Sequence, residues 1–244
     1  MTKKETTRNV ARIKKAFATV AMRSWKGAVK GNDSWHIFKV MAEFVDGFER
    51  LNKIGPCVSI FGSARTDPKN KYYILGEEIA FKLTKSGYGI ISGGGDGIME
   101  AANKGAQRAG GKSVGLNIHL PFEQNHNKFI DADKIFNFKY FFVRKVMFIR
   151  YAQGFIVLPG GYGTLDELSE ALTLIQTQKI ARFPIVLVGS EYWEGLNDWF
   201  KTTMLDEKNI DKTDLKLFHI VDTSDEAVAI INVFYKKYLL KPNF

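Results

Sequence analysis

The sequence has few of the residues that stabilise small or secreted proteins. Its 244 residues include one cysteine, Cys57, which excludes a disulfide framework and a cysteine-based zinc site. A chain of this length can bury a core without such supports. Its four histidines are scattered without the spacing of metal ligands. We therefore assign no metal and expect no cofactor.

Long apolar runs are also missing. No stretch approaches the roughly 18 apolar residues of a membrane span. The first five residues lack the apolar segment of a signal peptide, so we expect a cytoplasmic protein. A transit peptide is the less favoured interpretation of the basic, acid-poor beginning.

Acidic residues are outnumbered by basic ones, 26 against 35, which gives a net charge of +9. Such a balance first suggests a polyanionic partner such as nucleic acid. The excess is uneven, however, because residues 1–50 hold eleven basic and five acidic side chains, a net charge of +6. The rest of the chain carries only +3. Nucleic acid is therefore not the expected partner of the larger part of the chain.

Charge and hydrophobic periodicity along the chain predict a basic N-terminal helical arm, residues 1–54, followed by one domain, residues 55–244. Residues 1–30 are polar and lack strong periodicity. Asp33 and Ser34 have the side chains of a helix start, and apolar residues then recur at helical spacing as far as Leu51. We expect this amphipathic helix to pack on the domain or on a second subunit.

After Gly55-Pro56, short apolar runs alternate with helical stretches. The predicted strands are residues 57–61, 88–92, 113–118, 134–138, 155–158, 185–188 and 219–221. The predicted helices lie near residues 71–86, 97–109, 141–153, 165–178, 193–204 and 225–239. This alternation predicts an α/β fold, a Rossmann-like three-layer sandwich with a mostly parallel sheet.

Ligands of open parallel sheets bind beyond the carboxyl ends of the strands, so the loops that follow strands are candidate sites. The first such segment, Ile60-Phe61-Gly62-Ser63-Ala64-Arg65, offers the polar side chains of Ser63 and Arg65, but an ordinary strand-to-helix turn explains it equally well. The second contains Gly93, Gly94, Gly95 and Gly97. Its amides can face an anion at a helix start, although tight turning and close packing also favour glycine.

The third loop reads Pro159-Gly160-Gly161-Tyr162-Gly163-Thr164-Leu165-Asp166-Glu167. Its amides and the Thr164 hydroxyl can form a phosphate nest, assisted by the helix dipole. An acid such as Glu167 in a first helical turn is a common stabilising choice. Beside a phosphate, however, a carboxylate is unfavourable unless it holds ribose hydroxyls or activates water.

Two cations, Arg144 and Lys145, enter a helix that is otherwise apolar. Arg144 can bind phosphate or ribosyl oxygens through two hydrogen bonds, or stack on a base. A solvated pair at the edge of a buried helix is the open alternative.

Together, Ser92-Gly93-Gly94-Gly95, Arg144-Lys145 and the motif from Pro159 to Glu167 resemble the Lonely Guy (LOG) family. Its members are cytokinin riboside 5′-monophosphate phosphoribohydrolases, often mislabelled lysine decarboxylases. Nothing in this sequence marks a lysine as a Schiff base. The resemblance covers roughly residues 55–240, and Leu120–Gln124 and Tyr192-Trp193 are similar to a bacterial branch with longer chains.

The resemblance implies a homodimer with a nucleotide-binding catalytic domain. The implied reaction is hydrolysis of the N-glycosidic bond of a purine nucleoside 5′-monophosphate to free base and ribose 5-phosphate, as in an AMP nucleosidase. By position, it implies that Arg144 and Glu167 are catalytic. It implies substrate-binding roles for Gly93, Gly94, Gly95, Glu123, Lys145, Gly160, Gly161, Tyr162, Gly163, Thr164, Leu165, Asp166 and Thr173.

Two departures from the family pattern affect the expected base pocket. Glu100 stands where the plant-like pattern has glycine, and shorter members carry a Met-His pair at Tyr140–Val143, before the arginine. AMP and a prenylated adenine nucleotide therefore both stay open as substrates. The proton donor to the leaving base also stays open among Asp96, Asp166, Glu170 and solvent.

The competing hypothesis is a non-catalytic Rossmann-like module that binds a nucleotide, a cofactor or single-stranded DNA. The net charge of +9 favours it. Glu167 argues against it, because a pure binder has no evident need of a carboxylate beside a phosphate.

Overall fold

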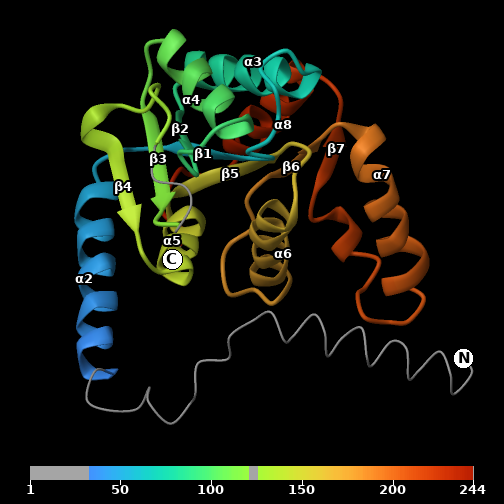
Figure 1. Ribbon diagram of the computed structural model, residues 1–244. Coiled ribbons are helices and arrows are strands. Elements are labelled where there is room, and N and C mark those ends of the chain that lie inside the picture. The colour runs from blue at the N-terminus through green and yellow to red at the C-terminus, as the bar shows by residue number, and fades with distance from the viewer. Residues whose placement is uncertain (1–32, 121–125, 244) are drawn as a thin grey trace, which may run out of the picture. The chain divides into compact units, whose positions relative to one another are not determined.

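The computed structural model describes residues 33–120 and 126–243 (Figure 1). Seven short strands form one sheet in the order β4-β3-β2-β1-β5-β6-β7, and every neighbouring pair is parallel. The strands are β1 (Cys57–Phe61), β2 (Gly89–Ser92), β3 (Ser113–Ile118), β4 (Ile135–Phe138), β5 (Ala152–Val157), β6 (Ile185–Val188) and β7 (His219–Val221). The predicted α/β fold is confirmed.

Seven α-helices accompany the sheet in the described ranges. They are α2 (Asp33–Leu51), α3 (Lys71–Lys85), α4 (Ile98–Arg108), α5 (Phe141–Tyr151), α6 (Tyr162–Gln176), α7 (Ser190–Trp199) and α8 (Ser224–Tyr235). Short 3₁₀ segments, Ala132–Lys134 and Asp214–Lys216, and a π-helical segment, Phe200–Met204, complete the list. None of the helices described is both long and apolar enough to cross a membrane.

Two hydrophobic cores lie on opposite faces of the sheet (Figure 1). Helices α3, α4 and α8 cover one face, and α5 and α6 cover the other. Side chains alternate along β1, where Val58 and Ile60 enter the first core and Cys57 and Phe61 enter the second. Each large side chain buried in this way contributes roughly 1.5–3 kcal/mol. Continuous apolar strands are thus explained by burial on both faces.

The helix predicted from Asp33 is present as α2, and a boundary between two structural units falls within it, after Lys39. The sheet and the cavity belong to the second unit, residues 40–244. Residues 1–32 lie outside the described ranges, so the division into an arm (1–54) and a domain (55–244) stays a prediction.

Several predicted boundaries differ from those of the structure, and three elements start three residues earlier than predicted. Strand β5 starts at Ala152 rather than at residue 155, and the polar Gln153 is accommodated because it is bonded to Tyr235 and Lys241. Helix α6 starts at Tyr162 rather than at residue 165, and its first turn contains Gly163, whose weak helix propensity led the pattern to predict a later start. Helix α7 starts at Ser190, and its predicted last turn is π-helical.

Strand β1 lies in the middle of the sheet. Strands β2, β3 and β4 follow on one side of it, and β5, β6 and β7 on the other. The loops after β1 and β5 therefore leave the sheet in opposite directions. In sheets of this topology, the crevice at the carboxyl ends of such strands is the usual ligand site.

Candidate active site

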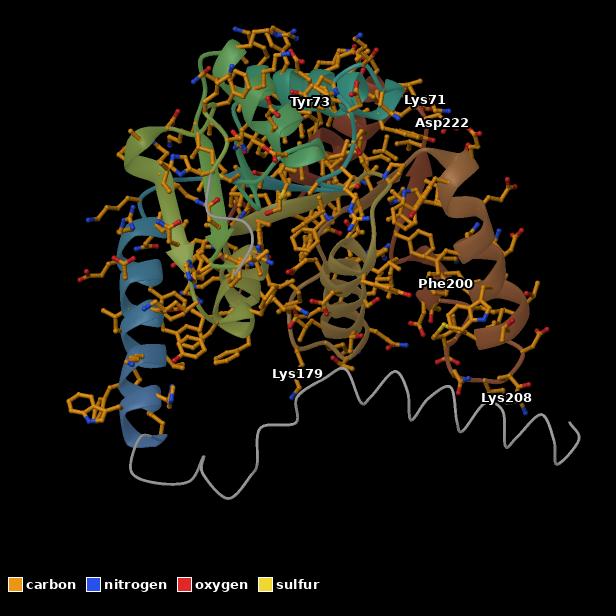
Figure 2. The ribbon with its side chains drawn as sticks, in the orientation of Figure 1. Lys71, Tyr73, Lys179, Phe200, Lys208 and Asp222 are labelled. Atoms are coloured by element: carbon orange, nitrogen blue, oxygen red, sulfur yellow. The ribbon has the colours of Figure 1, made fainter. Side chains whose placement is uncertain are left out.

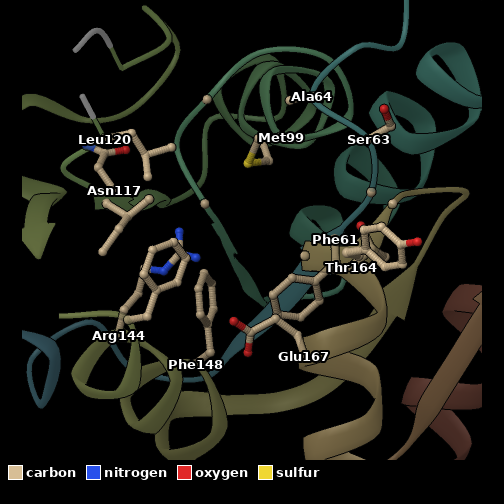
Figure 3. A pocket seen from close by; sticks show the side chains of 18 of the residues that line it. Phe61, Ser63, Ala64, Met99, Asn117, Leu120, Arg144, Phe148, Thr164 and Glu167 are labelled. Carbon is tan, nitrogen blue, oxygen red and sulfur yellow. The ribbon is translucent and has the colours of Figure 1, made fainter. Parts of the chain in front are cut away.

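A cavity of about 980 Å³ opens at this crevice (Figure 3). Its lining comes from the loops after β1, β2, β3 and β5, and from helices α5 and α6. Its volume is in the upper part of the range for small-molecule sites, roughly 300–1,000 Å³. The loops that the sequence marked as candidates thus meet around one space.

Residues 158–163 (the α6 loop) comprise the loop before α6 and the first residues of that helix, and Gly161, Tyr162 and Gly163 line the cavity. The Gly161 carbonyl accepts from the Thr164 and Leu165 amides and starts the helix. The amides of Gly161, Tyr162 and Gly163 donate to no acceptor among the residues described, and a Cβ on either glycine would meet nothing within 4 Å. Open amides at the positive end of a helix dipole form an anion site.

Glu167 lies one turn further along α6 and is 3% exposed. Burial raises the pKa of its carboxyl group to about 7, and the opposing charges of Arg144 and Lys145 only partly offset this effect. Its Oε2 atom is buried and accepts no hydrogen bond from any residue that the structure describes. A carboxyl group with a pKa near neutrality and an unused oxygen is suited to proton transfer.

Arg144 comes from α5 and points into the same cavity as Glu167 (Figure 3). Its guanidinium lies 5.1 Å from the Phe141 ring centroid and 5.6 Å from that of Phe148. Burial lowers the pKa of Arg144, whereas the Glu167 charge raises it, and an arginine remains protonated under such shifts. The cavity thus holds a fixed cation opposite a titratable acid.

Lys145, the next residue of α5, does not line the cavity. Its Nζ lies 2.8 Å from Asp166 Oδ1 and 3.2 Å from Glu170 Oε2. Burial opposes its charge, but the hydrogen bonds to the two acids outweigh this effect and raise its pKa. Lys145 therefore ties α5 to α6, the two helices that carry Arg144 and Glu167.

The loop before α4, residues 92–97 (the α4 loop), is held by a buried polar network. Asn127 Nδ2 donates to the carbonyls of Gly94 and Gly95 and to Asn103 Oδ1. Asn103 Oδ1 also accepts from the Ser92 hydroxyl. Here the loop carbonyls are bonded to the scaffold, which fixes the wall of the cavity.

The remaining wall combines aromatic and amide side chains. Phe61 and Phe148 meet edge to face, with ring centroids 4.9 Å apart. On the other side, Asn117 and Asn137 face each other across β3 and β4, with 3.2 Å between Nδ2 and Oδ1. A flat apolar ligand with polar edges fits a wall of this composition.

Comparison with known proteins agrees with the motifs. A family model described as "possible lysine decarboxylase" matches residues 99–231, more than half of the chain. The chain belongs to this family, the LOG family. It is 28% identical to cytokinin riboside 5′-monophosphate phosphoribohydrolase of Mycobacterium marinum, over 63% of this chain and 82% of that protein. The enzyme of the same name from Mycobacterium tuberculosis is 30% identical, with the same coverage of both chains.

Solved structures of other proteins share the fold of this LOG family member. The molybdenum cofactor carrier protein of Chlamydomonas reinhardtii matches with a TM-score of 0.56 and 20% identity. The match covers 75% of this chain and 99% of that one. At this identity, the likeness concerns the fold alone.

Of the site residues expected for a LOG protein, some line the cavity and others lie beside it. The lining includes Gly93, Gly95, Arg144, Gly161, Tyr162, Gly163, Thr164 and Glu167. Gly94, Lys145, Gly160, Leu165 and Asp166 do not line it. Thr173 is exposed further along α6 and donates to the Ser169 carbonyl. Glu123 lies outside the described residues.

Sequence reasoning missed part of the lining. The missed residues are Asn117, Ile118, His119, Leu120, His126, Asn137, Phe141 and Phe148. The rule that sites follow strand ends marks residues 117–120 and Asn137, which end β3 and β4. The aromatic residues gave no such signal, because a buried phenylalanine has the same pattern in a core.

Proposed function

We propose that this protein hydrolyses the N-glycosidic bond of a purine nucleoside 5′-monophosphate, releasing free base and ribose 5-phosphate. One observation carries the proposal: the buried Glu167 carboxyl group, with a pKa near 7, lies one helical turn from open amides in the same cavity. The named activity of the Mycobacterium relatives supports it.

In this proposal, the 5′-phosphate binds the amides of Gly161–Gly163 and the Thr164 hydroxyl. The ribose then lies against Glu167, and Arg144 fixes the substrate and balances its charge. The base occupies the wall of phenylalanine and asparagine side chains. Binding both ends of the nucleotide holds the glycosidic bond beside the carboxylate.

Cleavage of the bond between the base and C1′ develops positive charge on the ribose ring. Ionised Glu167 stabilises this charge and takes a proton from the water that attacks C1′. The departing base needs a proton on its ring nitrogen. Asp96, Asp166 and Glu170 do not line the cavity, and Lys145 pairs with the last two, so we assign this proton to solvent.

The base is proposed as adenine, plain or prenylated, which makes this an enzyme of the AMP nucleosidase or cytokinin biosynthesis type. The test incubates purified protein with AMP and with isopentenyladenosine monophosphate and follows free base by chromatography. Glu167→Ala should lose at least a thousandfold in rate, since both charge stabilisation and water activation are removed. Equal release by wild type and Glu167→Ala would refute the assignment.

Glu194→Gln is the matched control, because Glu194 is exposed on α7 and outside the cavity. The same experiment separates hydrolysis from simple carriage of a nucleotide. A carrier would bind AMP in a titration yet release no base.

We also propose that the protein is a homodimer. Apolar side chains of α2 and α5 are exposed, among them Met41 (54%), Val45 (57%), Phe141 (49%) and Phe142 (53%). Light scattering should give twice the 27.6 kDa mass of one chain, and Phe142→Glu should lower it. The cytoplasmic location and the absence of a nucleic-acid partner stay predictions. Nucleic-acid binding that survives deletion of residues 1–30 would contradict the latter.

A further inference from the structure

Tyr192, on α7, reaches the α6 loop from outside the cavity. Its hydroxyl donates to the Gly160 carbonyl, with 2.6 Å between the two oxygens. Neither Tyr192 nor Gly160 lines the cavity, whereas Gly161 does. The hydrogen bond therefore acts on the outer side of the loop, at the peptide group that precedes the first cavity-lining residue.

A trans peptide group is planar, and its C=O and N–H point in opposite directions. Holding the Gly160 carbonyl toward α7 therefore directs the Gly161 amide away from α7, and Gly161 is the residue of this peptide that lines the cavity. Without the bond, this peptide is free to rotate, because glycine on both sides permits a wide range of backbone angles. A rotated peptide would present a carbonyl oxygen where an anion needs an amide.

The neighbouring carbonyls of the loop are held by backbone donors. Pro159 accepts from the Ser63 amide at 2.9 Å, and Gly161 accepts within the start of α6. Among the bonds of these three carbonyls in the described part of the chain, only that of Gly160 comes from a side chain. A side-chain substitution at Tyr192 can therefore remove the hydrogen bond of Gly160, whereas the backbone bonds of Pro159 and Gly161 would remain.

The Tyr192 side chain is itself fixed in place. Its ring meets the ring of Trp193 edge to face, with centroids 4.9 Å apart, and Trp193 is buried and bonded to the Val188 carbonyl. The first turn of α7 is held by Asp222, which accepts from the Ser190 amide and hydroxyl at 2.7 Å. Lys71, near Asp222 in Figure 2, pairs with Glu191 at 2.6 Å.

We propose that Tyr192 is a positioning residue that orients the Gly160–Gly161 peptide so that the Gly161 amide faces the substrate phosphate. This role rests on the proposed function, since it requires the phosphate to bind the α6 loop. It makes Tyr192 specific for the phosphate end of the substrate, although its side chain lies outside the cavity.

The test compares wild type with Tyr192→Phe, which removes the hydroxyl and keeps the ring. Loss of one hydrogen bond of this kind should raise KM for AMP about 3- to 10-fold and leave kcat within about twofold. The inhibition constant of inorganic phosphate should rise by the same factor. With adenosine, which lacks the phosphate, kcat/KM should not change. Tyr238→Phe, on an exposed side chain at the C-terminal end, is the matched control.

Unchanged KM for AMP and unchanged phosphate inhibition in Tyr192→Phe would overturn the proposal. An equal loss with adenosine would also overturn it, because Tyr192 would then support the site as a whole. If wild type releases no base, the proposed function fails, and phosphate binding measured by ³¹P NMR then decides the role of Tyr192. Weaker phosphate binding to Tyr192→Phe supports it, and equal or absent binding rejects it.

Discussion

The α4 loop and the α6 loop both follow a strand of the same sheet and both carry glycines before a helix, but the glycines face different surroundings. A Cβ on Gly97 would lie 2.4 Å from the Ser63 carbonyl oxygen, and the residue has a φ of +62°. Gly161 and Gly163 have negative φ values or helical geometry and open space beside them. One set of glycines allows close packing, and the other leaves room.

The hydrogen bonds of the two loops differ in the same way. In the α4 loop, Asn127 holds the carbonyls of Gly94 and Gly95 against the scaffold. In the α6 loop, the carbonyls of Pro159, Gly160 and Gly161 accept from the Ser63 amide, the Tyr192 hydroxyl and the first amides of α6. Glycine content alone therefore does not identify an anion site, whereas open space beside Gly161 and Gly163 distinguishes the α6 loop.

The largest expected effect contrasts one glycine from each loop. Gly97→Ala should lower the free energy of unfolding by about 3–4 kcal/mol, because it combines backbone strain with a clash against backbone atoms. Gly163→Ala should raise it by roughly 0.5–1 kcal/mol, since alanine favours the helix and its methyl group meets no atom. Urea titrations measure both values.

Gly163→Ala should also weaken binding of AMP, because the methyl group projects into the space proposed for phosphate. If Gly97→Ala and Gly163→Ala lowered the free energy of unfolding equally, the α4 loop would not be more tightly packed than the α6 loop.

The second effect concerns the cost of Glu167 to stability. Its pKa rises from an ordinary value of 4.5 to about 7 on folding, so between these pH values the folded protein keeps a proton that the unfolded chain has lost. The free energy of unfolding therefore falls as pH rises through this window. Glu167→Gln should be more stable than wild type above pH 7 by on the order of 2–3 kcal/mol, and no more stable below pH 4.5.

Thermal unfolding of both proteins at pH 4 and pH 8 measures this difference. In wild type, kcat/KM should rise tenfold per pH unit below about pH 7 and level off above it, because the ionised carboxylate is the active form. A profile that falls through pH 7 would instead assign Glu167 as an acid.

The smallest expected effect concerns Asn127, whose side chain supports the α4 loop. Asn127→Ala should lower the free energy of unfolding by about 1–2 kcal/mol, since the half-buried Gly95 carbonyl loses its donor while the Gly94 carbonyl keeps the backbone amide of residue 127. Hydrogen exchange at the amides of residues 95–99 should rise with it. Asn209→Ala, on an exposed side chain, is the control. Lost stability without faster exchange would show that Asn127 does not hold this loop.

Much of the fold could be predicted from residue patterns. The runs at 57–61, 113–118, 185–188 and 219–221 became strands with the predicted bounds. Of these, β1 and β6 are buried along their whole length, as apolar runs in a parallel sheet are expected to be. The start of α6 was predicted three residues late. Glycine weakens helix propensity, and the sequence does not reveal the tertiary bonds that hold such a turn.

The sequence by itself determined the alternation of strands and helices, the placement of loops at strand ends and the LOG motifs. Only the tertiary structure decided which glycine loop is open, that Lys145 pairs with Asp166 and Glu170, and that Tyr192 reaches Gly160 across 32 positions. Local patterns follow from burial and backbone propensity, which each residue carries with it. Hydrogen-bond partners and the pKa of Glu167 depend on what the fold brings alongside, and no spacing in the chain encodes that.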